Sequence, residues 1–508
     1  MAAVEEAASV PPHGEPPAPG AAALPEARQS RLPPCTPAEL RQRISGGEYL
    51  VIINGLVCKL NGFVDKHPGG PLAIMHMVGR DATDEVVAMH PGDVYECTMP
   101  RWAVARFVPD DSDSSAISYV EDMDLPYSAP RLSALRSDGH AQPGKASDGL
   151  DYAAIQRDYR LLDQRLHREG YYKCNYKAYA LELALFVALV AGAMGPIVSG
   201  SPRTWPCVFA AICMALLRQQ TAFLAHDLGH CSVTGRRRLD WALGIFFSDF
   251  LGGISLGWWK KDHNVHHIVT NDPDNDPDIQ HLPFIANSTR FFESPYSTYY
   301  GRVMQFGAVS RLLVSLQDKL YYPIMAAISW VTLYVMSWSY LLFSDFAPFR
   351  LVEIGCVLAY AARVGLALSC IPTWRNLVLF VVVSNSAAAL LGVQILLSHY
   401  AMSTESPDPV HECFCARQVR TTMDISCPAW LDWFHGGLQF QIEHHLFPRL
   451  PRHKLKRVQP MVKDLCRRHG IEFKEFSFID GNVYTVRWLG EVASRVKLYN
   501  AHEHSKAA

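Results

Sequence analysis

Three short histidine motifs hold the residues of this chain best suited to catalytic chemistry. In each motif the candidate ligands lie three or four positions apart, so on a helix they project from one face toward a common point. The motifs are His226-Asp227-Leu228-Gly229-His230, His263-Asn264-Val265-His266-His267 and Gln441-Ile442-Glu443-His444-His445. Neutral imidazole binds iron, copper, zinc and nickel. Because one catalytic metal ion takes about three protein ligands, seven histidines with Gln441 predict a site for two metal ions.

Further polar residues lie near these motifs in the sequence. His399 closes the last long apolar segment, and we expect it to be another metal ligand or, alternatively, an anchor of that segment at the membrane surface. We expect His281 to be a loop residue, with an outer metal ligand as the alternative, and His435 to be a packing residue or a support for a ligand. Four aspartates lack the glycine and the terminal glutamate of a calcium-binding loop, so we expect them to orient the second motif. They are Asp272, Asp274, Asp276 and Asp278.

A second histidine system lies closer to the N-terminus, in His67-Pro68-Gly69-Gly70 and in His90. The two glycines allow the backbone to approach a flat ligand closely. Two neutral imidazoles on separate segments can bind haem iron from both faces, which leaves no open position for oxygen. His76 is the rival for the second position, but it lies too close to His67 for both to flank one porphyrin. The alternative reading of the first motif is a purely structural turn.

Composition narrows the class of protein. The chain has 508 residues, 47 basic and 49 acidic side chains, and 19% charged residues, which is below the usual ~25%. Such a charge balance offers no basic field for nucleic acid, and 49% hydrophobic residues indicate that part of the chain lies in lipid. The 13 cysteines show no disulfide spacing, and we see no secretory signal, so we expect reduced thiols.

The chain divides into four regions. Residues 1–34 are rich in Ala, Pro and Glu and are expected to form a disordered tail, since a transit peptide would be rich in Arg. Residues 35–110 predict a small soluble domain with a strand at 49–53 and a turn at Asn54-Gly55. Residues 111–150 are polar and acidic and predict a linker, and residues 151–508 form the remaining domain.

Long apolar segments occur only in this last region. Four of them, together with a fifth over 321–343, are long enough to cross a hydrocarbon core of about 30 Å as helices. We expect 321–343 to lie in the interface without crossing, because the histidine motifs need to share one side of the membrane. A shorter segment over 241–257 contains Asp249 and four glycines and is expected to be interfacial or re-entrant. The four expected spans are 178–198, 205–225, 351–371 and 376–398.

The three motifs together resemble those of the membrane fatty-acyl desaturase and hydroxylase superfamily, and residues 36–108 resemble cytochrome b5. Their fusion in one chain, with Gln441 where many relatives carry histidine, is similar to the front-end desaturase branch. Residues 258–283 and 420–451 are similar to the sphingolipid delta-8 desaturases of fungi and plants, although delta-6 acyl desaturases share most of this pattern.

This resemblance implies a fold, a site and a reaction. The fold is multi-domain, a small α+β haem domain followed by an all-α multi-pass membrane domain with cytosolic histidine boxes, in the endoplasmic reticulum membrane. His67 and His90 would be the axial ligands of haem b. The ligands of a di-iron centre would be His226, His230, His263, His266, His267, His399, Gln441, His444 and His445.

The same resemblance implies the reaction partners. Electrons would come from NAD(P)H through a separate cytochrome b5 reductase, because no dinucleotide-binding fingerprint is present. The product would carry a double bond between carbons 8 and 9 of the long-chain base of a ceramide-type lipid. We expect Asn271, Asp272 and Gln280 to bind the polar end of that substrate. The alternatives are a delta-6 acyl desaturase, a di-iron lipid hydroxylase, a membrane-anchored haem carrier and a transporter.

Overall fold

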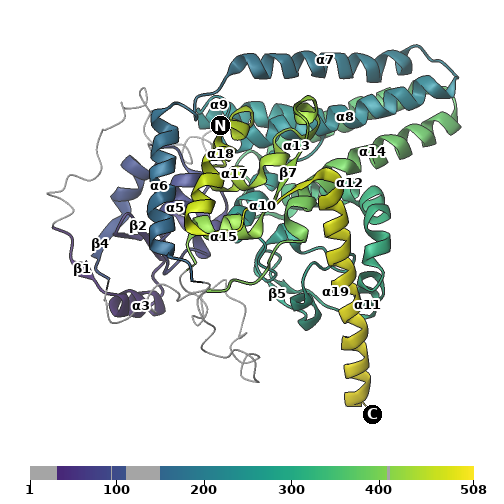
Figure 1. Ribbon diagram of the computed structural model, residues 1–508. Coiled ribbons are helices and arrows are strands. Elements are labelled where there is room, and N and C mark those ends of the chain that lie inside the picture. The colour runs from purple at the N-terminus through teal and green to yellow at the C-terminus, as the bar shows by residue number, and fades with distance from the viewer. Residues whose placement is uncertain (1–30, 93, 110–148, 409–411, 508) are drawn as a thin grey trace. The chain divides into compact units, whose positions relative to one another are not determined.

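The computed structural model describes residues 31–92, 94–109, 149–408 and 412–507. Most of the expected N-terminal tail and of the expected linker lie outside these residues. Contacts divide the chain into two units, Met1–Asn61 with Val78–Tyr119 and Gly62–Met77 with Val120–Ala508. Each unit is described in turn (Figure 1).

The first unit is built on a four-stranded sheet in the order β1-β4-β3-β2. β2 and β3 pair antiparallel around Asn54 and Gly55, whose φ angles of 50° and 72° confirm the predicted turn. All four side chains of β2 are buried, and Thr36 caps the first helix with a side-chain hydrogen bond to Glu39 N–H. The elements are β1 (Pro34–Cys35), α3 (Pro37–Ser45), β2 (Leu50–Ile53), β3 (Leu56–Lys59), α5 (Thr83–Met89), η2 (Val94–Thr98), η3 (Met99–Trp102) and β4 (Ala103–Phe107).

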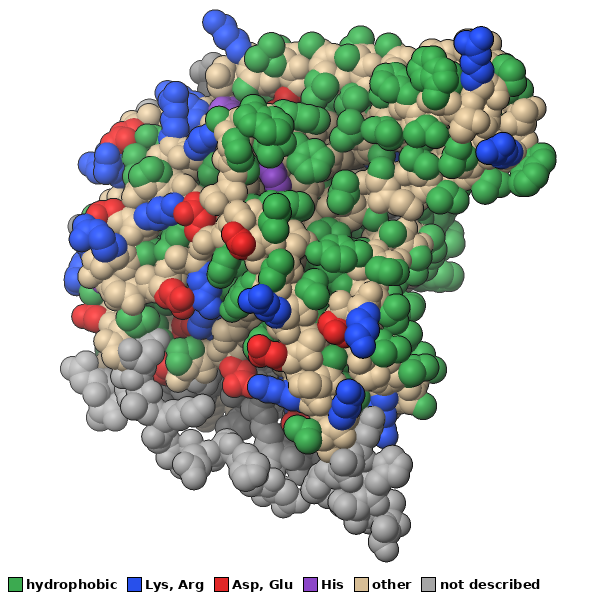
Figure 2. Space-filling view, turned by 45° about the vertical axis from the view of Figure 1, so that its right-hand side comes forward, with side chains coloured by type: hydrophobic (Ala, Val, Ile, Leu, Met, Phe, Trp, Pro, Cys, Tyr) green, Lys and Arg blue, Asp and Glu red, His purple; other side chains and the backbone are tan. Residues whose placement is uncertain are grey.

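Among its described residues, the second unit contains four straight helices that are long and apolar enough to cross a membrane, by length and composition. They coincide with the four spans that the sequence predicts. Their bounds are α7 (Tyr176–Val198), α8 (Thr204–Gly229), α13 (Arg350–Ser369) and α14 (Trp374–Tyr400). α8 packs between α7 and α14, and large apolar side chains of α7 such as Leu181 face outward, 76% exposed. Figure 2 shows hydrophobic side chains dominating this part of the surface, as expected for contact with lipid.

Two further apolar segments are bent, and they are the two for which the sequence predicts something other than a straight span. α9 (Arg237–Ile245) and η5 (Phe246–Gly252) meet α10 (Leu256–Ile268) at 110°. α12 (Gln317–Phe343) bends by 46° between Ser329 and Val331. The first bend places α10, which carries the second histidine motif, against the ends of the straight spans.

Shorter elements close the second unit around the ends of α8 and α14. β7 pairs with β8 in parallel, and the C-terminal helix α19 packs on α12 and α14. Apolar residues of α12, α14 and α19 form a buried cluster there that includes Tyr321, Tyr400 and Leu489. The remaining elements are η1 (Val64–Lys66), α4 (Pro71–Met75), α6 (Tyr152–Arg168), η6 (Pro277–Ile279), η7 (Thr289–Glu293), β5 (Tyr296–Ser297), β6 (Arg302–Val303), α11 (Ala308–Val314), α15 (Phe414–Thr421), β7 (Asp424–Ser426), η8 (Ala429–Leu431), α16 (Asp432–His435), η9 (Leu438–Phe440), α17 (Gln441–Leu446), α18 (Arg452–His469), β8 (Glu475–Ser477) and α19 (Phe478–Ala507).

Candidate metal centre

The histidines of the three motifs meet in two adjacent clusters, built by the ends of α8 and α14 and by α10 and α17. In the first cluster one ring nitrogen of each of four histidines lies within 4.8 Å of the others, and its members are His226, His230, His263 and His444. The second cluster meets the same distance criterion with His266, His399 and His445. Histidines as far apart in the sequence as His226 and His444 thus share one cluster.

The two remaining predicted ligands lie at the same place. His267 Nε2 is 3.1 Å from His263 Nε2 and 3.2 Å from His444 Nε2, and its ring centroid is 4.4 Å from that of His445, so His267 lies between the clusters. Gln441 Nε2 is 3.3 Å from His399 Nε2, and its buried Oε1 has no hydrogen-bond partner. Exchanging the amide oxygen and nitrogen of Gln441 would aim the oxygen at the second cluster.

Each imidazole of the second cluster has its Nδ1 held by a protein acceptor. His266 Nδ1 lies 2.9 Å from Asp276 Oδ2, His445 Nδ1 lies 2.9 Å from Gln418 Oε1, and His399 Nδ1 lies 3.2 Å from the carbonyl of Thr421. Such acceptors fix the proton on Nδ1 and leave the lone pair on Nε2, as in protein metal sites. His445 Nε2 is buried and has no hydrogen-bond partner, which suits a metal ligand.

Two of the four aspartates in the loop after α10 contact histidines of the second motif, as the sequence predicts. Asp276 is fully buried, and its carboxylate accepts hydrogen bonds from His266 Nδ1 and from the backbone N–H of Asn271, at 2.9 and 2.7 Å. Asp278 Oδ2 lies 3.8 Å from His263 Nδ1. Carboxylates behind ligand histidines raise the basicity of the imidazole and fix its direction.

Burial keeps the histidines at the junction of the clusters in their neutral form. Removal from water lowers the pKa of His444 and His445 well below the usual value, and the neighbouring imidazoles lower it further. Burial also lowers the pKa of His230 well below the usual value, and the imidazoles around it lower it further. Neutral imidazole is the form that binds a metal ion, so these groups need lose no proton to act as ligands at neutral pH.

Trp259 forms one wall of the first cluster. Its ring stacks on His263 with centroids 4.5 Å apart and meets His226 and His230 edge-on at 5.2 and 5.6 Å. It fits against the backbone of Gly229, where a Cβ would lie 2.1 Å from Trp259 Cζ3. The glycine is therefore required for the indole to reach the histidines.

We expect Gly229→Ala to lower the activity of the site about 100-fold, because the added methyl group displaces Trp259 and with it His226 and His263. Turnover and bound metal per polypeptide in purified protein would measure this. Gly195→Ala is the matched control, since Gly195 lies in a span and has open space around its Cβ position. Normal turnover of Gly229→Ala would show that Trp259 does not position the histidines.

Two further histidines have the places that the sequence predicts for them. His281 lies outside both clusters and has Nδ1 2.6 Å from Tyr400 Oη, which confirms a loop residue. His435 contacts Gln394 at 3.2 Å and is buried, as expected for packing or support.

Asn271, Asp272 and Gln280, which the sequence predicts to bind the polar end of the substrate, each make hydrogen bonds within the protein. Asn271 Nδ2 donates to the carbonyls of His399, Met402 and Ser403. Asp272 accepts from Asp274 N–H and Asn275 Nδ2. Gln280 donates to the carbonyl of Pro273 and accepts from Ser297. They hold the loop after α10 in shape and tie it to the end of α14.

Gln418 is a residue of the site that sequence reasoning missed. Its side chain is fully buried, lies beside His445, accepts from Thr270 Oγ1 at 3.0 Å and donates to the carbonyl of His267 at 2.9 Å. It thus joins α15 to two of the motifs. A single glutamine has no spacing signature, so no sequence signal could have singled it out.

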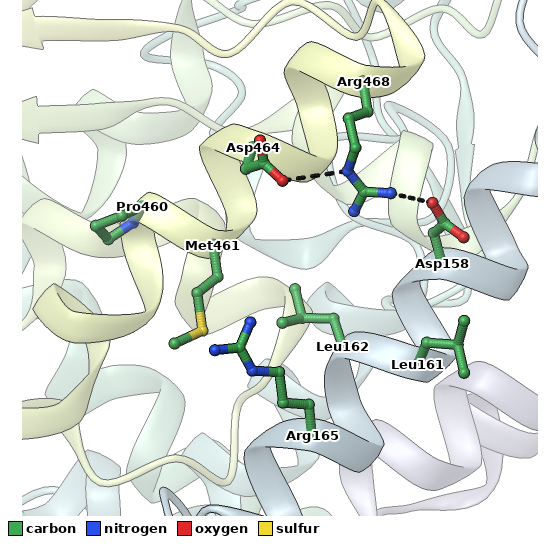
Figure 3. Close-up of a pocket in the computed structure, with 8 residues that line it drawn as sticks. All are labelled: Asp158, Leu161, Leu162, Arg165, Pro460, Met461, Asp464 and Arg468. Atoms are coloured by element: carbon green, nitrogen blue, oxygen red, sulfur yellow. Dashed lines mark hydrogen bonds and ion pairs between the residues drawn. The ribbon is translucent and has the colours of Figure 1, made fainter.

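A surface groove of about 390 Å³ lies between α6 and α18 and is separate from the clusters. Figure 3 shows Arg468 in its wall, paired with Asp158 and Asp464. None of its lining residues is a histidine of the clusters, so it is not the cavity of this metal centre. They are Asp158, Leu161, Leu162, Arg165, Pro460, Met461, Asp464 and Arg468.

In each of the two predicted haem ligands, ring Nδ1 lies beside a backbone carbonyl. His67 belongs to the second unit and His90 to the first. His67 is 8% exposed and has Nδ1 2.9 Å from the carbonyl of Gly70. His90 caps the end of α5 and has Nδ1 3.1 Å from the carbonyl of Val86. With Nδ1 engaged by a carbonyl, Nε2 is the nitrogen that would bind iron in each residue.

Comparison with known proteins gives matches over both parts of the chain. Residues 203–477 match the family model described as fatty acid desaturase, and residues 36–122 match the one described as cytochrome b5-like heme/steroid binding domain. The chain is 37% identical to the Delta 8-(E)-sphingolipid desaturase of Komagataella phaffii, over 92% of this chain and 95% of that protein. It is 36% identical to the protein of the same name from Emericella nidulans, over 90% and 94%. It is 32% identical to Delta(8)-fatty-acid desaturase 2 of Arabidopsis thaliana, over 91% and 94%.

Proposed function

The chain belongs to the fatty acid desaturase family and carries a cytochrome b5-like domain before its helical membrane domain, and from this premise we propose that it is a sphingolipid delta-8 desaturase. The double bond would form between carbons 8 and 9 of the long-chain base of a ceramide-type lipid. Similarity to the fungal Delta 8-(E)-sphingolipid desaturases over about nine-tenths of the chain supports this substrate. The (E) in their names makes the trans isomer the expected product.

The observation that carries the proposal is the meeting of nine candidate ligands in two adjacent clusters. His226, His230, His263 and His444 would hold one iron ion. His266, His399 and His445, with Gln441, would hold the second, and His267 lies within reach of both. Imidazole is a suitable ligand for iron, and the unpartnered His445 Nε2 and Gln441 Oε1 fit this assignment.

Desaturation removes two hydrogens from adjacent methylenes and, with dioxygen, two electrons and two protons, gives a double bond and two waters. Bound iron would supply the activation of dioxygen. The chain's own residues position the substrate and exclude water, since the clusters are buried where the apolar spans end. Geometry of this kind selects one pair of methylenes in a chain of chemically similar ones.

We propose haem b, bound through His67 and His90, as the source of these electrons. The cytochrome b5-like family match supports the haem. Cytochrome b5 reductase would reduce that haem from NAD(P)H, because the chain has no glycine-rich dinucleotide-binding motif of its own.

The histidine clusters would face the cytosol from the endoplasmic reticulum membrane. The two short connections at the opposite ends of the spans, residues 199–203 and 370–373, carry Arg203 as their one basic residue. On the histidine side, Arg236, Arg237 and Arg238 follow α8 within ten residues. An excess of Lys and Arg marks the cytosolic side of membrane proteins.

Expression in a yeast that lacks sphingolipid desaturation tests the substrate. We expect a new double bond at carbon 8 of the long-chain bases and unchanged fatty acids, measured by separate mass spectrometry of the two fractions. Cells carrying His444→Ala are the control. Double bonds found only in the fatty acids would favour a front-end acyl desaturase, and hydroxylated bases would favour a lipid hydroxylase; either result would contradict the proposal.

A further inference from the structure

The bend before α10, residues 249–257, brings two buried carboxyl groups to the start of the helix that carries the second histidine motif. Asp249 Oδ2 accepts a hydrogen bond from Leu256 N–H at 3.0 Å. Glu353 Oε2 accepts from Gly257 N–H at 3.2 Å and from Ser255 Oγ at 2.5 Å. Both carboxyl side chains have no exposed surface. A buried ionisable side chain at the end of an apolar span is costly and indicates a specific role.

All four backbone N–H groups at the start of α10 have a side-chain acceptor. Such groups lack partners within the helix. Besides Leu256 and Gly257, Ser255 N–H donates to Ser337 Oγ on α12 and Trp258 N–H donates to Ser255 Oγ, both at 3.0 Å. The start of α10 is therefore fixed to three neighbours, η5, α12 and α13.

Glu353 is the centre of this arrangement because it comes from a different span and makes two of the contacts. It lies on α13, and a Cβ on Gly257 would be 2.7 Å from Glu353 Oε1 and 2.8 Å from Tyr340 Oη. Gly257 thus allows α10 to approach the carboxyl group more closely than any other residue would.

The direction of α10 determines where its histidines lie in both clusters. His263 belongs to the first cluster, His266 to the second, and His267 lies between them. His263 is seven residues beyond Leu256, about 10 Å along the helix, so a tilt at the start of α10 displaces all three imidazoles together.

We propose that Glu353 is a positioning residue for the metal centre, which holds the first turn of α10 so that one helix supplies ligands to both clusters. The proposal rests on the proposed function, since it concerns the same metal centre. In the part of the chain that the structure describes, Glu353 makes no hydrogen bond to a histidine of either cluster, and its effect passes through Ser255 and Gly257.

The test compares Glu353→Ala with Glu353→Gln in the full-length protein. Alanine removes the oxygen that accepts both hydrogen bonds, and we expect iron per haem and turnover to fall at least about tenfold with an unchanged haem spectrum. The carbonyl oxygen of glutamine can still accept from Ser255 and Gly257, and its amide can donate to Asp249, which is within hydrogen-bonding reach of residue 353. Glu353→Gln is therefore expected to retain at least half of the iron and turnover.

Asn376→Ala is the matched control. Asn376 is also buried on a span and donates to the carbonyl of Pro202 at 3.0 Å, but it makes no contact with α10. If Glu353→Ala does not accumulate, Ser255→Ala removes the cap of Trp258 and is expected to lower iron per haem in the same direction.

Two results would overturn the proposal. Normal iron per haem in Glu353→Ala would show that these hydrogen bonds do not position the ligand histidines. If Glu353→Ala does not accumulate, normal iron per haem in Ser255→Ala would show the same. Loss of turnover in Glu353→Gln with full iron would show that the acid group itself is needed. A wild-type protein that binds no iron or desaturates no lipid would instead refute the proposed function, whatever the variants do.

Discussion

We expect His444→Ala to lower desaturation more than about 100-fold and to leave the haem spectrum of the protein unchanged. His444 is 4% exposed, belongs to the first cluster, and has Nε2 3.2 Å from His267 Nε2. Alanine offers no ligand atom, and a buried site cannot replace the imidazole with one from another part of the chain. The loss is therefore near complete rather than graded.

The measurement is lipid turnover and iron content of the purified full-length variant, with the haem absorbance as a measure of folded protein. His469→Ala is the control, because His469 contacts Asp158 at 2.9 Å and lies outside both clusters. Wild-type turnover in His444→Ala would refute the proposed role of His444 as a ligand of the metal centre. The same loss of turnover in His469→Ala would mean that replacing a histidine lowers turnover by destabilising the folded protein.

His67→Ala is expected to abolish the low-spin haem b spectrum while the iron of the metal centre is retained. His67 is buried, and the carbonyl of Gly70 orients its ring through Nδ1. Haem with two histidine ligands loses its spectral signature when either is removed. His90→Ala should have the same effect.

His76→Ala is the control for haem binding, since His76 is the rival ligand by sequence and is expected to be dispensable. Absorbance of the reduced full-length protein measures the haem, and metal analysis measures the iron. A normal Soret band in His67→Ala, or its loss in His76→Ala, would contradict the assignment of the axial ligands. Turnover in His67→Ala should be lost, because the variant lacks its electron donor.

Much of the fold could be predicted because it depends on local properties of the sequence. Hydropathy alone located the four straight spans, and the glycines and Asp249 marked the segment that bends by 110°. The family matches and these helices confirm the predicted fold class, a small α+β cytochrome b5-like domain followed by a helical membrane domain. Helical spacing also indicated which histidines share a face.

The rest depends on contacts between distant segments, which leave no periodic pattern. Nothing in the sequence assigns His263 to one cluster and His266 to the other, because this depends on where α8, α14 and α17 meet α10. Gln418 contacts the carbonyl of His267 across 151 positions, and Glu353 contacts Ser255 across 98. The contacts of Asn271 could not be predicted for the same reason, since its three acceptors lie more than 120 positions away.

The wide separation of the ligands in the chain also sets the order in which the centre can be made during synthesis. His267 and His444 are 177 positions apart, which at 5–20 residues per second corresponds to roughly 9–35 s of translation. By the end of that interval all four straight spans have been synthesised, and only then do His444 and His445 follow to complete the two clusters. Neither cluster can therefore be complete before the last span has been made. A chain truncated between α14 and α17 would contain each of these spans but neither complete cluster.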